Sequence, residues 1–241
     1  MPRFYCPQPL AAGATIDLPA AVAHHAWVVR LQPGTTLTLF NGEGGQFDAE
    51  LLTLDKKGAS ARILAFTARE CELPYPLTLV QALPEAGKMD WIIEKSVELG
   101  VAAIVPVLAQ RSVVRLSGER AEKRHAHWQG IIVAAAEQSG RNRLPALAPL
   151  SQLREFTASA GGAQRILLSP RAQQPLAAWA AARAPQALTV LIGPEGGLTD
   201  EEEAAALEGG AIALGLGPRV LRTETAGLAV LATLAAIWGE H

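Results

Sequence analysis

Residues 191–203 read LIGPEGGLTDEEE, and residues 215–227 read GLGPRVLRTETAG. In each stretch an apolar run that is typical of a buried strand ends in glycines, and the second stretch adds Arg219 and Arg222 ahead of a long apolar segment. Glycines that follow parallel strands lie at the carboxyl edge of the sheet, where open α/β sheets bind ligands. A single loop of this kind could be an ordinary tight turn. Two of them, with the arginines beside them, predict a ligand pocket.

The segments around these loops alternate between two patterns. Short apolar runs predict buried strands, and apolar residues at every third or fourth position predict helices. The expected strands lie at 77–83, 101–108, 165–169, 188–193 and 211–216, and the expected helices at 89–99, 119–139, 175–184, 199–208 and 223–238. This alternation is typical of a parallel sheet covered by helices, which is an α/β fold.

The first part of the chain has a different pattern. Residues 35–40, 47–54 and 59–67 read as strands, with one short helix expected at 20–31. These elements predict a small β-barrel or sandwich. The paired prolines of ELPYP, residues 72–76, discourage both helix and central strand, so we read this segment as a linker. The sequence thus predicts two domains, 1–72 and 73–241.

The bulk composition narrows the function classes. The chain has 241 residues, of which 49% are hydrophobic and 18% charged, with a formal net charge of −2, so any nucleic-acid contact must rely on local basic clusters. Cys6 and Cys71 have no metal-ligand spacing, and no His/Cys/Asp cluster has it either, so no metal is expected. The start of the chain lacks a signal-peptide pattern, and the apolar stretch 226–238 is shorter than the ~20 residues that span a bilayer. We therefore expect a soluble cytoplasmic protein without a membrane partner.

Two common nucleotide-binding patterns do not fit the glycine loops. The P-loop pattern G-x-x-x-x-G-K-[ST] is absent, and a dinucleotide fingerprint would follow the first strand of the sheet, whereas these glycines lie in the last quarter of the chain. The remaining interpretation is a ligand held by loop backbone and apolar walls. Because the dinucleotide fingerprint is absent, the sequence also argues against a nicotinamide-dependent oxidoreductase.

The chain resembles the SPOUT methyltransferases, and more narrowly the ribosomal RNA small subunit methyltransferase E family. The resemblance extends over nearly the whole length and rests on HHAWVVRLQPG, LFNGEGGQFDAEL, GKMDWIIEKSVELGV, the arginine of AQRS, AAEQSGRNRLP, LIGPEGG and LGPRVLRTETA. It implies a PUA-like, RNA-binding β-barrel at 1–72 and a SPOUT domain with a deep trefoil knot at 73–241. It also implies an S-adenosylmethionine (SAM) site in the knot, a homodimer, and methylation of N3 of a uridine in 16S rRNA. The partner would be small-subunit rRNA or the assembled small ribosomal subunit.

The resemblance also assigns the cofactor site. The implied cofactor-binding residues are Leu168, Ser169, Leu191, Ile192, Gly193, Pro194, Glu195, Gly196, Leu214, Leu216, Gly217, Pro218, Val220, Leu221, Thr225 and Ala226. Against the family pattern, Gly215–Leu216 reads as an insertion, which leaves open whether Leu214 or Leu216 meets the adenine. Trp91 stands where the family usually has a smaller side chain.

Methylation at N3 requires loss of the N3 proton, which pushes negative charge onto the uracil carbonyl oxygens, and a fixed guanidinium stabilises such charge. Arg222 is the expected catalytic residue, with capping of loop carbonyls as its alternative role. Arg219 has the same two readings and is more typical of a structural residue. Glu195 either orients its loop or meets the substrate. The sequence offers no convincing general base.

The expected RNA contacts lie outside these loops. They are Arg3, Arg30, Asn41, Gly42, Gly44, Gly45, Arg111, Glu137, Gln138, Arg141 and Arg143. The last helix, 223–238, is apolar nearly all round, so it is either deep in a core or shared with a second subunit. We expect the second, with Leu228, Leu231, Leu234 and Trp238 on the shared surface.

Two other functions remain open. A SPOUT enzyme could methylate another base, or a ribose, in tRNA or large-subunit RNA, because the cofactor loops do not encode the target. A non-catalytic RNA-binding module could keep the same fold, although the intact GPEGG and LRTETA loops argue against it.

Overall fold

A computed structural model describes residues 1–85, 87–159 and 162–239 of the chain. The chain divides into two compact units, one formed by Met1–Glu72 with Ala136–Leu144 and the other by Leu73–Ala135 with Pro145–His241. The segment 136–144 therefore belongs to the first unit, and not to the second domain where the sequence had placed it. Side-chain contacts explain the difference, because Glu137 accepts a hydrogen bond from the Tyr5 amide at 2.8 Å and Arg141 pairs with Glu72.

The first unit is built on a five-stranded sheet in the order β1-β3-β4-β5-β2. Its elements are β1 (Arg3–Tyr5), β2 (Thr15–Asp17), α1 (Ala20–Val28), β3 (Thr36–Phe40), β4 (Gln46–Leu54) and β5 (Ala59–Thr67). Along β4 the side chains of Phe47, Ala49 and Leu51 are buried, while those between them are not, as expected for a sheet with one covered face. The core of the unit also includes Ala26 of α1 and Ile63 of β5.

The second unit contains a seven-stranded sheet in which β12-β10-β11-β6-β7-β8 are consecutive neighbours and β9 also pairs with β7. The strands are β6 (Leu77–Ala82), β7 (Ala103–Leu108), β8 (Ala146–Leu147), β9 (Ser151–Gln152), β10 (Gln164–Leu168), β11 (Leu188–Ile192) and β12 (Ala211–Leu214). Every pairing that the described residues make in this sheet is parallel, as the strand–helix alternation predicted. The carboxyl ends of β12, β10 and β11 therefore lie next to one another.

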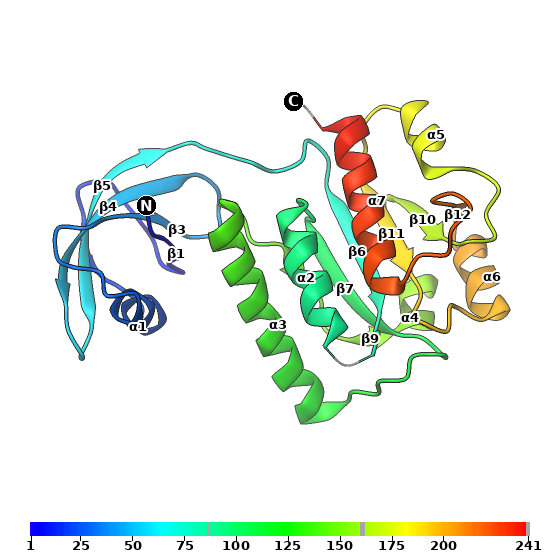
Figure 1. Ribbon diagram of the computed structural model, residues 1–241, viewed down its shortest axis with the longest axis horizontal. Coiled ribbons are helices and arrows are strands. Elements are labelled where there is room, and N and C mark those ends of the chain that lie inside the picture. The colour runs from blue at the N-terminus through cyan, green and yellow to red at the C-terminus, as the bar shows by residue number, and fades with distance from the viewer. Residues whose placement is uncertain (86, 160–161, 240–241) are drawn as a thin grey trace. The chain divides into compact units, whose positions relative to one another are not determined.

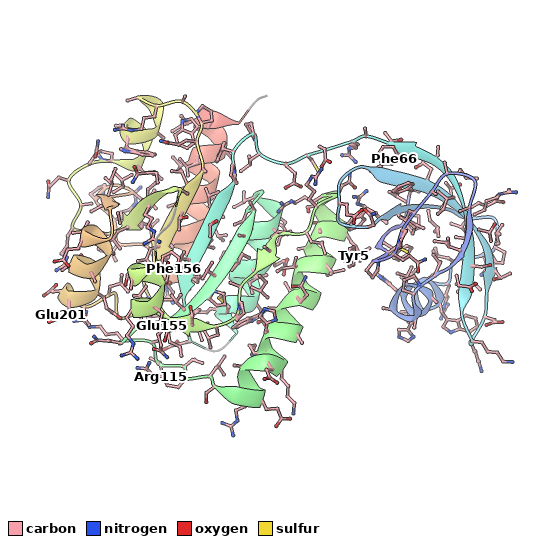
Figure 2. The ribbon with its side chains drawn as sticks, turned by 180° about the vertical axis from the view of Figure 1, so that it is seen from behind. Tyr5, Phe66, Arg115, Glu155, Phe156 and Glu201 are labelled. Atoms are coloured by element: carbon pink, nitrogen blue, oxygen red, sulfur yellow. The ribbon has the colours of Figure 1, made fainter. Side chains whose placement is uncertain are left out.

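Helices cover both faces of this sheet. They are α2 (Lys88–Glu98), α3 (Gly118–Ser139), α4 (Leu153–Ala158), α5 (Leu176–Ala181), α6 (Asp200–Glu208) and α7 (Thr223–Trp238). Strand β6 shows the division, because Val80 and Ala82 join a core with residues of α4 and α6, while Leu79 faces Gly227 of α7. Helices α2 and α7 lie side by side over one face (Figure 1). On the other face, Phe156 of α4 packs against the core to which Ala206 of α6 contributes (Figure 2).

Helix α7 buries most of its large apolar residues within its own chain. Leu231 and Leu234 are 0% exposed and Trp238 is 5% exposed. The Trp238 indole donates hydrogen bonds to the carbonyl oxygens of Ala180 and Arg183, at 2.9 and 3.0 Å. The sequence predicted that Leu228, Leu231, Leu234 and Trp238 form a surface shared with a second subunit. For Leu231, Leu234 and Trp238 this is wrong, because α2, α5 and the sheet already cover them, whereas Leu228 is half-buried. The side of α7 that stays open carries small residues, among them Ala232 and Ala236.

Helix α6 begins at Asp200, close to the start at residue 199 that the sequence predicted. Thr199 caps α6 by accepting a hydrogen bond from the Glu202 amide at 3.2 Å, and the Glu202 carboxylate accepts one from the Thr199 amide at 3.0 Å. This reciprocal pair is a capping box, and it fixes the end of the loop that starts at Gly193.

Among the described residues, no helix combines the length and the apolar character needed to cross a membrane.

Candidate functional site

A cavity of ≈ 410 Å³ lies where the loops after β10, β11 and β12 meet the start of α7. Its lining comes from four short segments of the second unit and from the first residue of α2. The residues that line it are Lys88, Leu168, Ser169, Pro170, Ile192, Gly193, Pro194, Glu195, Gly197, Leu198, Glu203, Leu216, Gly217, Arg219, Val220, Leu221, Arg222, Thr223, Glu224 and Ala226. The two glycine loops thus form one pocket, as the sequence predicted.

Most of the residues expected at the cofactor site line this cavity, and some do not. Those that line it are Leu168, Ser169, Ile192, Gly193, Pro194, Glu195, Leu216, Gly217, Val220, Leu221 and Ala226. Leu191 and Leu214 are buried in the core, at 4% and 0% exposure. Of the two candidates for the adenine contact, Leu216 lines the cavity and Leu214 does not, because β12 ends at Leu214 with its side chain still inside the sheet core. Gly196, Pro218 and Thr225 also lie outside the lining.

Gly196 faces another loop. A Cβ added at Gly196 would lie 3.2 Å from Cβ of Arg111, on the segment that follows β7. The Arg111 guanidinium donates hydrogen bonds to the carbonyl oxygens of Gly196 and Leu198, at 3.0 and 3.1 Å. We expected Gly196 to allow the ligand to approach the backbone, but it allows Arg111 to approach. Arg111 therefore braces the glycine loop.

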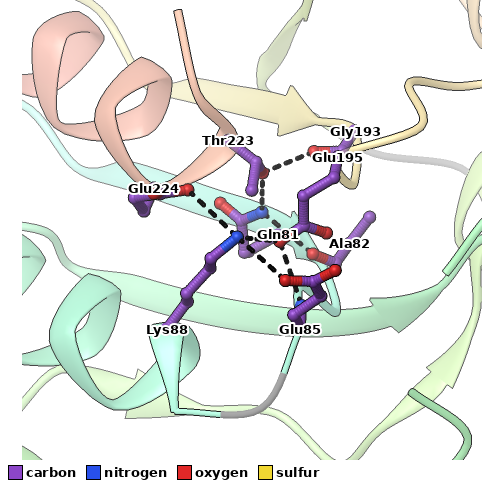
Figure 3. A network of polar contacts seen from close by, with 8 residues as sticks. All are labelled: Gln81, Ala82, Glu85, Lys88, Gly193, Glu195, Thr223 and Glu224. Carbon is purple, nitrogen blue, oxygen red and sulfur yellow. Dashed lines mark hydrogen bonds and ion pairs between the residues drawn. The ribbon is translucent and has the colours of Figure 1, made fainter. Parts of the chain in front are cut away.

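Lys88 is a pocket residue to which the sequence reasoning gave no role. Its Nζ lies 2.7 Å from Oε1 of Glu195, 3.5 Å from Oε2 of Glu85 and 4.0 Å from Oε2 of Glu224 (Figure 3). The Glu195 carboxylate also accepts a hydrogen bond from the Glu85 amide at 3.0 Å. The hydrogen bond to Glu195 raises the pKa of Lys88 above its ordinary value, although burial opposes this. Lys88 is thus a fixed cation at the pocket.

Glu195 has its carboxylate occupied by these contacts. Burial alone would raise the pKa of Glu195, but the hydrogen bonds from Lys88 and from backbone amides outweigh it and hold the pKa below its ordinary value. Of the two roles left open for Glu195, the contacts favour orientation of the loop. These contacts join the loop after β11 to the start of α2. The sequence did not predict that these two segments lie close together.

A second polar chain joins three segments beside the pocket. The Thr223 hydroxyl donates a hydrogen bond to the Gly193 carbonyl at 2.6 Å and accepts one from Nε2 of Gln81 at 2.9 Å (Figure 3). Gln81 is 0% exposed, and its Nε2 also donates to the Ala82 carbonyl at 2.9 Å. The chain fixes the first turn of α7 against the end of β6 and the glycine loop. Neither Gln81 nor Thr223 was identified from the sequence.

Three carboxylates line the cavity, and their partners differ. Glu195 pairs with Lys88, and Glu203 pairs with Arg171 at 2.7 Å. The Glu224 carboxylate makes no hydrogen bond with the described residues, and its buried Oε2 has only the 4.0 Å ion pair with Lys88. A buried carboxylate oxygen without a hydrogen-bond donor is uncommon and calls for an explanation.

The segment between β12 and α7 carries the two arginines of the opening motif. Arg219 and Arg222 line the cavity and are exposed, and neither guanidinium forms a hydrogen bond or an ion pair within the described part of the chain. Val220 between them is 82% exposed. The alternative role of Arg222 as a cap for loop carbonyls has no support in these contacts. Both arginines are available to a ligand.

The residues expected to bind RNA in the first unit fall into two groups. The first group is committed to internal contacts. Arg3 donates to Gln46 at 3.0 Å and to the Arg141 carbonyl at 2.9 Å, and its guanidinium lies over the Phe40 ring. Arg141 is 3% exposed and pairs with Glu72, so its side chain holds the segment 136–144 in place and is not an accessible RNA contact. The Glu137 carboxylate is occupied by the Tyr5 amide, and burial raises its pKa.

The second group lies at the surface of the first unit. Arg143, Arg30 and Gln138 are exposed, and Arg143 pairs with Glu70 at 3.1 Å. Gly42 forms an isolated backbone bridge with Arg143, so the loop 41–45 and the segment after α3 lie together. At Gly44, where φ is 104°, a side chain would be strained and would meet the Arg143 guanidinium. Asn41 bonds to Glu43 within the loop, and Gly45 donates a hydrogen bond to Glu70 at 3.2 Å.

The described residues contain no group of three or more His, Cys, Asp or Glu side chains placed to hold a metal ion. Cys6 is buried and Cys71 is exposed, and both are free thiols. Burial raises the pKa of Cys6 to about 11.

Comparison with known proteins gives matches over both units. Residues 71–235 match the family described as RNA methyltransferase domain, and residues 18–64 match the family described as RNA methyltransferase PUA domain. The chain is 32% identical to ribosomal RNA small subunit methyltransferase E from Bacillus subtilis, over 94% of this chain and 92% of that protein.

Two solved structures are also similar to the whole chain. One is a ribosomal RNA small subunit methyltransferase E from Neisseria gonorrhoeae bound to S-adenosyl methionine. It has a TM-score of 0.92 and 41% identity, and the match covers 99% of this chain and 98% of that one. The other is a putative methyltransferase from Legionella pneumophila in complex with SAM. It has a TM-score of 0.94 and 34% identity, and the match covers 100% of this chain and 99% of that one. With both domain matches and this extent of similarity, the chain belongs to the ribosomal RNA small subunit methyltransferase E family of RNA methyltransferases.

Proposed function

We propose that this protein transfers a methyl group from SAM to N3 of a uridine in the 16S rRNA of the small ribosomal subunit, in the cytoplasm. The observation that carries the proposal is the ≈ 410 Å³ cavity walled by the loops after β10, β11 and β12. The SAM complexes of the relatives from Neisseria gonorrhoeae and Legionella pneumophila support the choice of cofactor. The small-subunit names of the relatives support the choice of substrate.

The residues of the cavity fit this cofactor. Its volume lies within the range of about 300 to 1,000 Å³ that is typical of small-molecule sites. Leu168, Ile192, Leu216 and Leu221 supply apolar walls that suit the adenine ring, and Lys88 and Glu195 supply charge that suits the amino-acid end of the molecule. When bound, SAM supplies a methyl group on a positively charged sulfur, so the protein need not activate the methyl donor.

The protein must instead bind and polarise the base that receives the methyl group. Loss of the N3 proton places negative charge on the uracil carbonyl oxygens, and a preorganised cation stabilises that charge. We assign this role to Arg222, whose exposed guanidinium lines the cavity and has no partner among the described residues. Arg219 has the same freedom and is the alternative. A guanidinium also stays charged at any physiological pH and presents several N–H donors to a carbonyl oxygen.

The first unit is proposed to bind RNA away from the reacting base. Arg30, Arg143 and the loop 41–45 are the exposed candidates there, and the match of residues 18–64 to a PUA domain supports this role. With a net charge of −2, the chain has no strong global field to hold flexible RNA. We therefore expect affinity to come from many weak contacts to a shaped substrate.

Two structural features belong to the same proposal. The segment between β12 and α7 is proposed to thread a deep trefoil knot of the SPOUT type, which the convergence of three loops on one pocket supports. The active form is proposed to be a homodimer. The open face of α7, with Ala232 and Ala236, lies beside α2, whose Trp91 is 44% exposed, and this is a surface that a second copy could cover.

A methyl-transfer assay with tritiated SAM tests the function. Assembled small subunits lacking the modification, naked 16S rRNA and a short uridine oligonucleotide are compared at equal uridine concentration. We expect methylation of the subunit and little or none of the oligonucleotide, because the latter offers too few contacts to offset the entropy of ordering it. Equal rates on all three substrates would contradict the proposed recognition. Methyl transfer to large-subunit RNA or tRNA alone would reassign the target.

A further inference from the structure

We propose that Glu224 is the catalytic base, whose carboxylate takes the proton from the ring nitrogen that becomes methylated. The inference rests on the proposed function and adds a residue to it. The residues of the pocket motif gave no convincing general base when read from the sequence. The structure places three carboxylates on the cavity, and only one of them lacks hydrogen bonds among the described residues.

The position of Glu224 suits this role. It is the second residue of α7, its side chain is 18% exposed and lines the cavity, and its Oε2 is buried without a hydrogen-bond donor. The neighbouring Thr223 is held by Gln81 and Gly193, so the backbone that carries Glu224 is fixed. A positioned carboxylate with unused acceptor capacity is suited to receive an N–H group.

The other two carboxylates are less suited. Glu195 accepts hydrogen bonds from Lys88 and from the Glu85 amide, and Glu203 is paired with Arg171. Proton transfer to either would break existing contacts. Lys88 lies 4.0 Å from Glu224, outside hydrogen-bonding distance, so it leaves the acceptor sites of the carboxylate open.

The proton and electrons balance in a single displacement. The N3–H bond breaks as the proton passes to a Glu224 oxygen, and the electron pair left on N3 forms the bond to the methyl carbon. The bond between that carbon and the sulfur of SAM breaks at the same time, its electron pair stays on sulfur, and neutral S-adenosylhomocysteine leaves. The carboxylic acid formed at Glu224 then returns its proton to solvent. Arg222 and Arg219, on the segment before α7, would meanwhile hold the charge on the carbonyl oxygens.

The experiment compares wild type, Glu224→Gln, Glu224→Asp and the surface control Glu208→Gln in the full-length protein. Methyl transfer to small subunits that lack the modification gives kcat and KM at a series of pH values. Titration calorimetry with SAM gives the cofactor affinity independently of activity, and circular dichroism checks folding. The other charged groups that line the cavity are Lys88 on α2, Glu195 after β11, Glu203 on α6, and Arg219 and Arg222 before α7. They are unchanged in all variants.

We expect Glu224→Gln to lower kcat at neutral pH by about 10²-fold to 10⁴-fold, the usual contribution of a positioned general base, with SAM affinity changed by less than about threefold. The activity that remains should rise steadily with pH, because hydroxide can then remove the proton, whereas the wild-type rate should level off. Glu224→Asp should retain more activity than Glu224→Gln, and Glu208→Gln should match the wild type.

Two results would overturn this inference but not the proposed function. The first is a Glu224→Gln enzyme with the wild-type kcat. The second is a Glu224→Gln enzyme that loses activity only because it no longer binds SAM, which would make Glu224 a cofactor ligand. If Glu224→Gln misfolds, the decision rests on Glu224→Asp, and a shift of its pH profile relative to wild type supports the inference while an unchanged profile contradicts it. An inactive wild type would overturn the proposed function and this inference with it.

Discussion

Thr223 is the residue through which the glycine loop, β6 and α7 are joined. Its hydroxyl donates to the Gly193 carbonyl and accepts from the buried Gln81 amide. Thr223→Val keeps the shape of the side chain but leaves the Gly193 carbonyl and the Gln81 amide without the hydroxyl as a hydrogen-bond partner. We expect the free energy of unfolding to fall by about 1–3 kcal/mol, the usual cost of an unsatisfied buried polar group. Urea denaturation measures it.

The control for this substitution is Thr225→Val, on the same turn of α7 but exposed. Exposed substitutions usually change stability by less than about 0.5 kcal/mol. Equal losses in the two variants would show that the hydrogen bonds of Thr223 do not hold the loop.

Lys88 gives a prediction about pH. The pKa of Glu195 is lowered in the folded protein, so ionised Glu195 contributes stability above its unfolded pKa, and that contribution is lost as the pH falls through the folded pKa. Lys88→Met removes the cation that favours this ionised form. The variant should therefore be less stable than wild type at neutral pH, and the difference should shrink well below the ordinary glutamate pKa of about 4.3. Thermal unfolding at both pH values tests this, and a difference that grows in acid would contradict it.

At this scale the sequence predicted the apolar and glycine residues of the pocket better than its charged ones. Gly193, Leu216 and Leu221 follow strands, so their place at the sheet edge can be read from chain order. Lys88 and Gln81 meet the pocket only because β6 is the neighbour of β11, and strand order is a property of the tertiary fold. The same limit applies to Gly196, whose contact with Arg111 depends on the loop after β7.

The first turn of helix α6 contacts the loop after β7 as well as its own N-cap residue. One carboxylate oxygen of Glu202 accepts from the Thr199 amide, and the other accepts from the Gln110 amide at 2.8 Å. Glu202→Ala should therefore cost about 1–2 kcal/mol of stability, which includes the usual value of a cap. Glu201→Ala, an exposed acid one position earlier, is the matched control in the same denaturation experiment. If both variants lose the same amount, the helix dipole and not the cap is responsible.

The elements that could be predicted from the sequence are those with a repeating pattern. Helices α3 and α7 and strands β6, β7 and β11 are long enough for their apolar periodicity to identify them. Strands β1, β2, β8 and β9 have only two or three residues each, and the pairing with longer strands makes them extended. Helix α4 was also missed, since its six residues are fewer than two turns and a capping box at Gln152 and Glu155 fixes them.

For the whole molecule, the segment 136–144 changes how a truncation must be designed. Deletion of residues 1–72 would remove Glu72, the ion-pair partner of the buried Arg141. It would also remove Arg69, whose carbonyl oxygen accepts a hydrogen bond from the buried Asn142 side chain. If the first unit served only to bind RNA, such a truncation would keep SAM binding and lose activity on the subunit. The loss of these partners would also destabilise the end of α3, so substitutions at exposed positions of the first unit, such as Arg143→Ala, separate RNA binding from folding better.

The proposed homodimer gives a prediction that leaves the core intact. Ala232 lies on the open face of α7, so Ala232→Arg adds a charge there without entering the chain's own core. We expect wild type to be a dimer at micromolar concentration and Ala232→Arg to be a folded monomer, because an unpaired charge in a contact surface is costly. Light scattering measures the mass and circular dichroism the fold. A wild-type monomer that is fully active would contradict the proposal.

The most direct test of the central claim is mass mapping of modified uridines in RNA from cells with and without the gene for this protein. We predict that one N3-methyluridine in 16S rRNA disappears when the gene is removed, and that it returns with the wild-type gene but not with Glu224→Gln. Large-subunit RNA and tRNA should be unchanged. An unaltered 16S rRNA, or a modification lost from another RNA instead, would contradict the account.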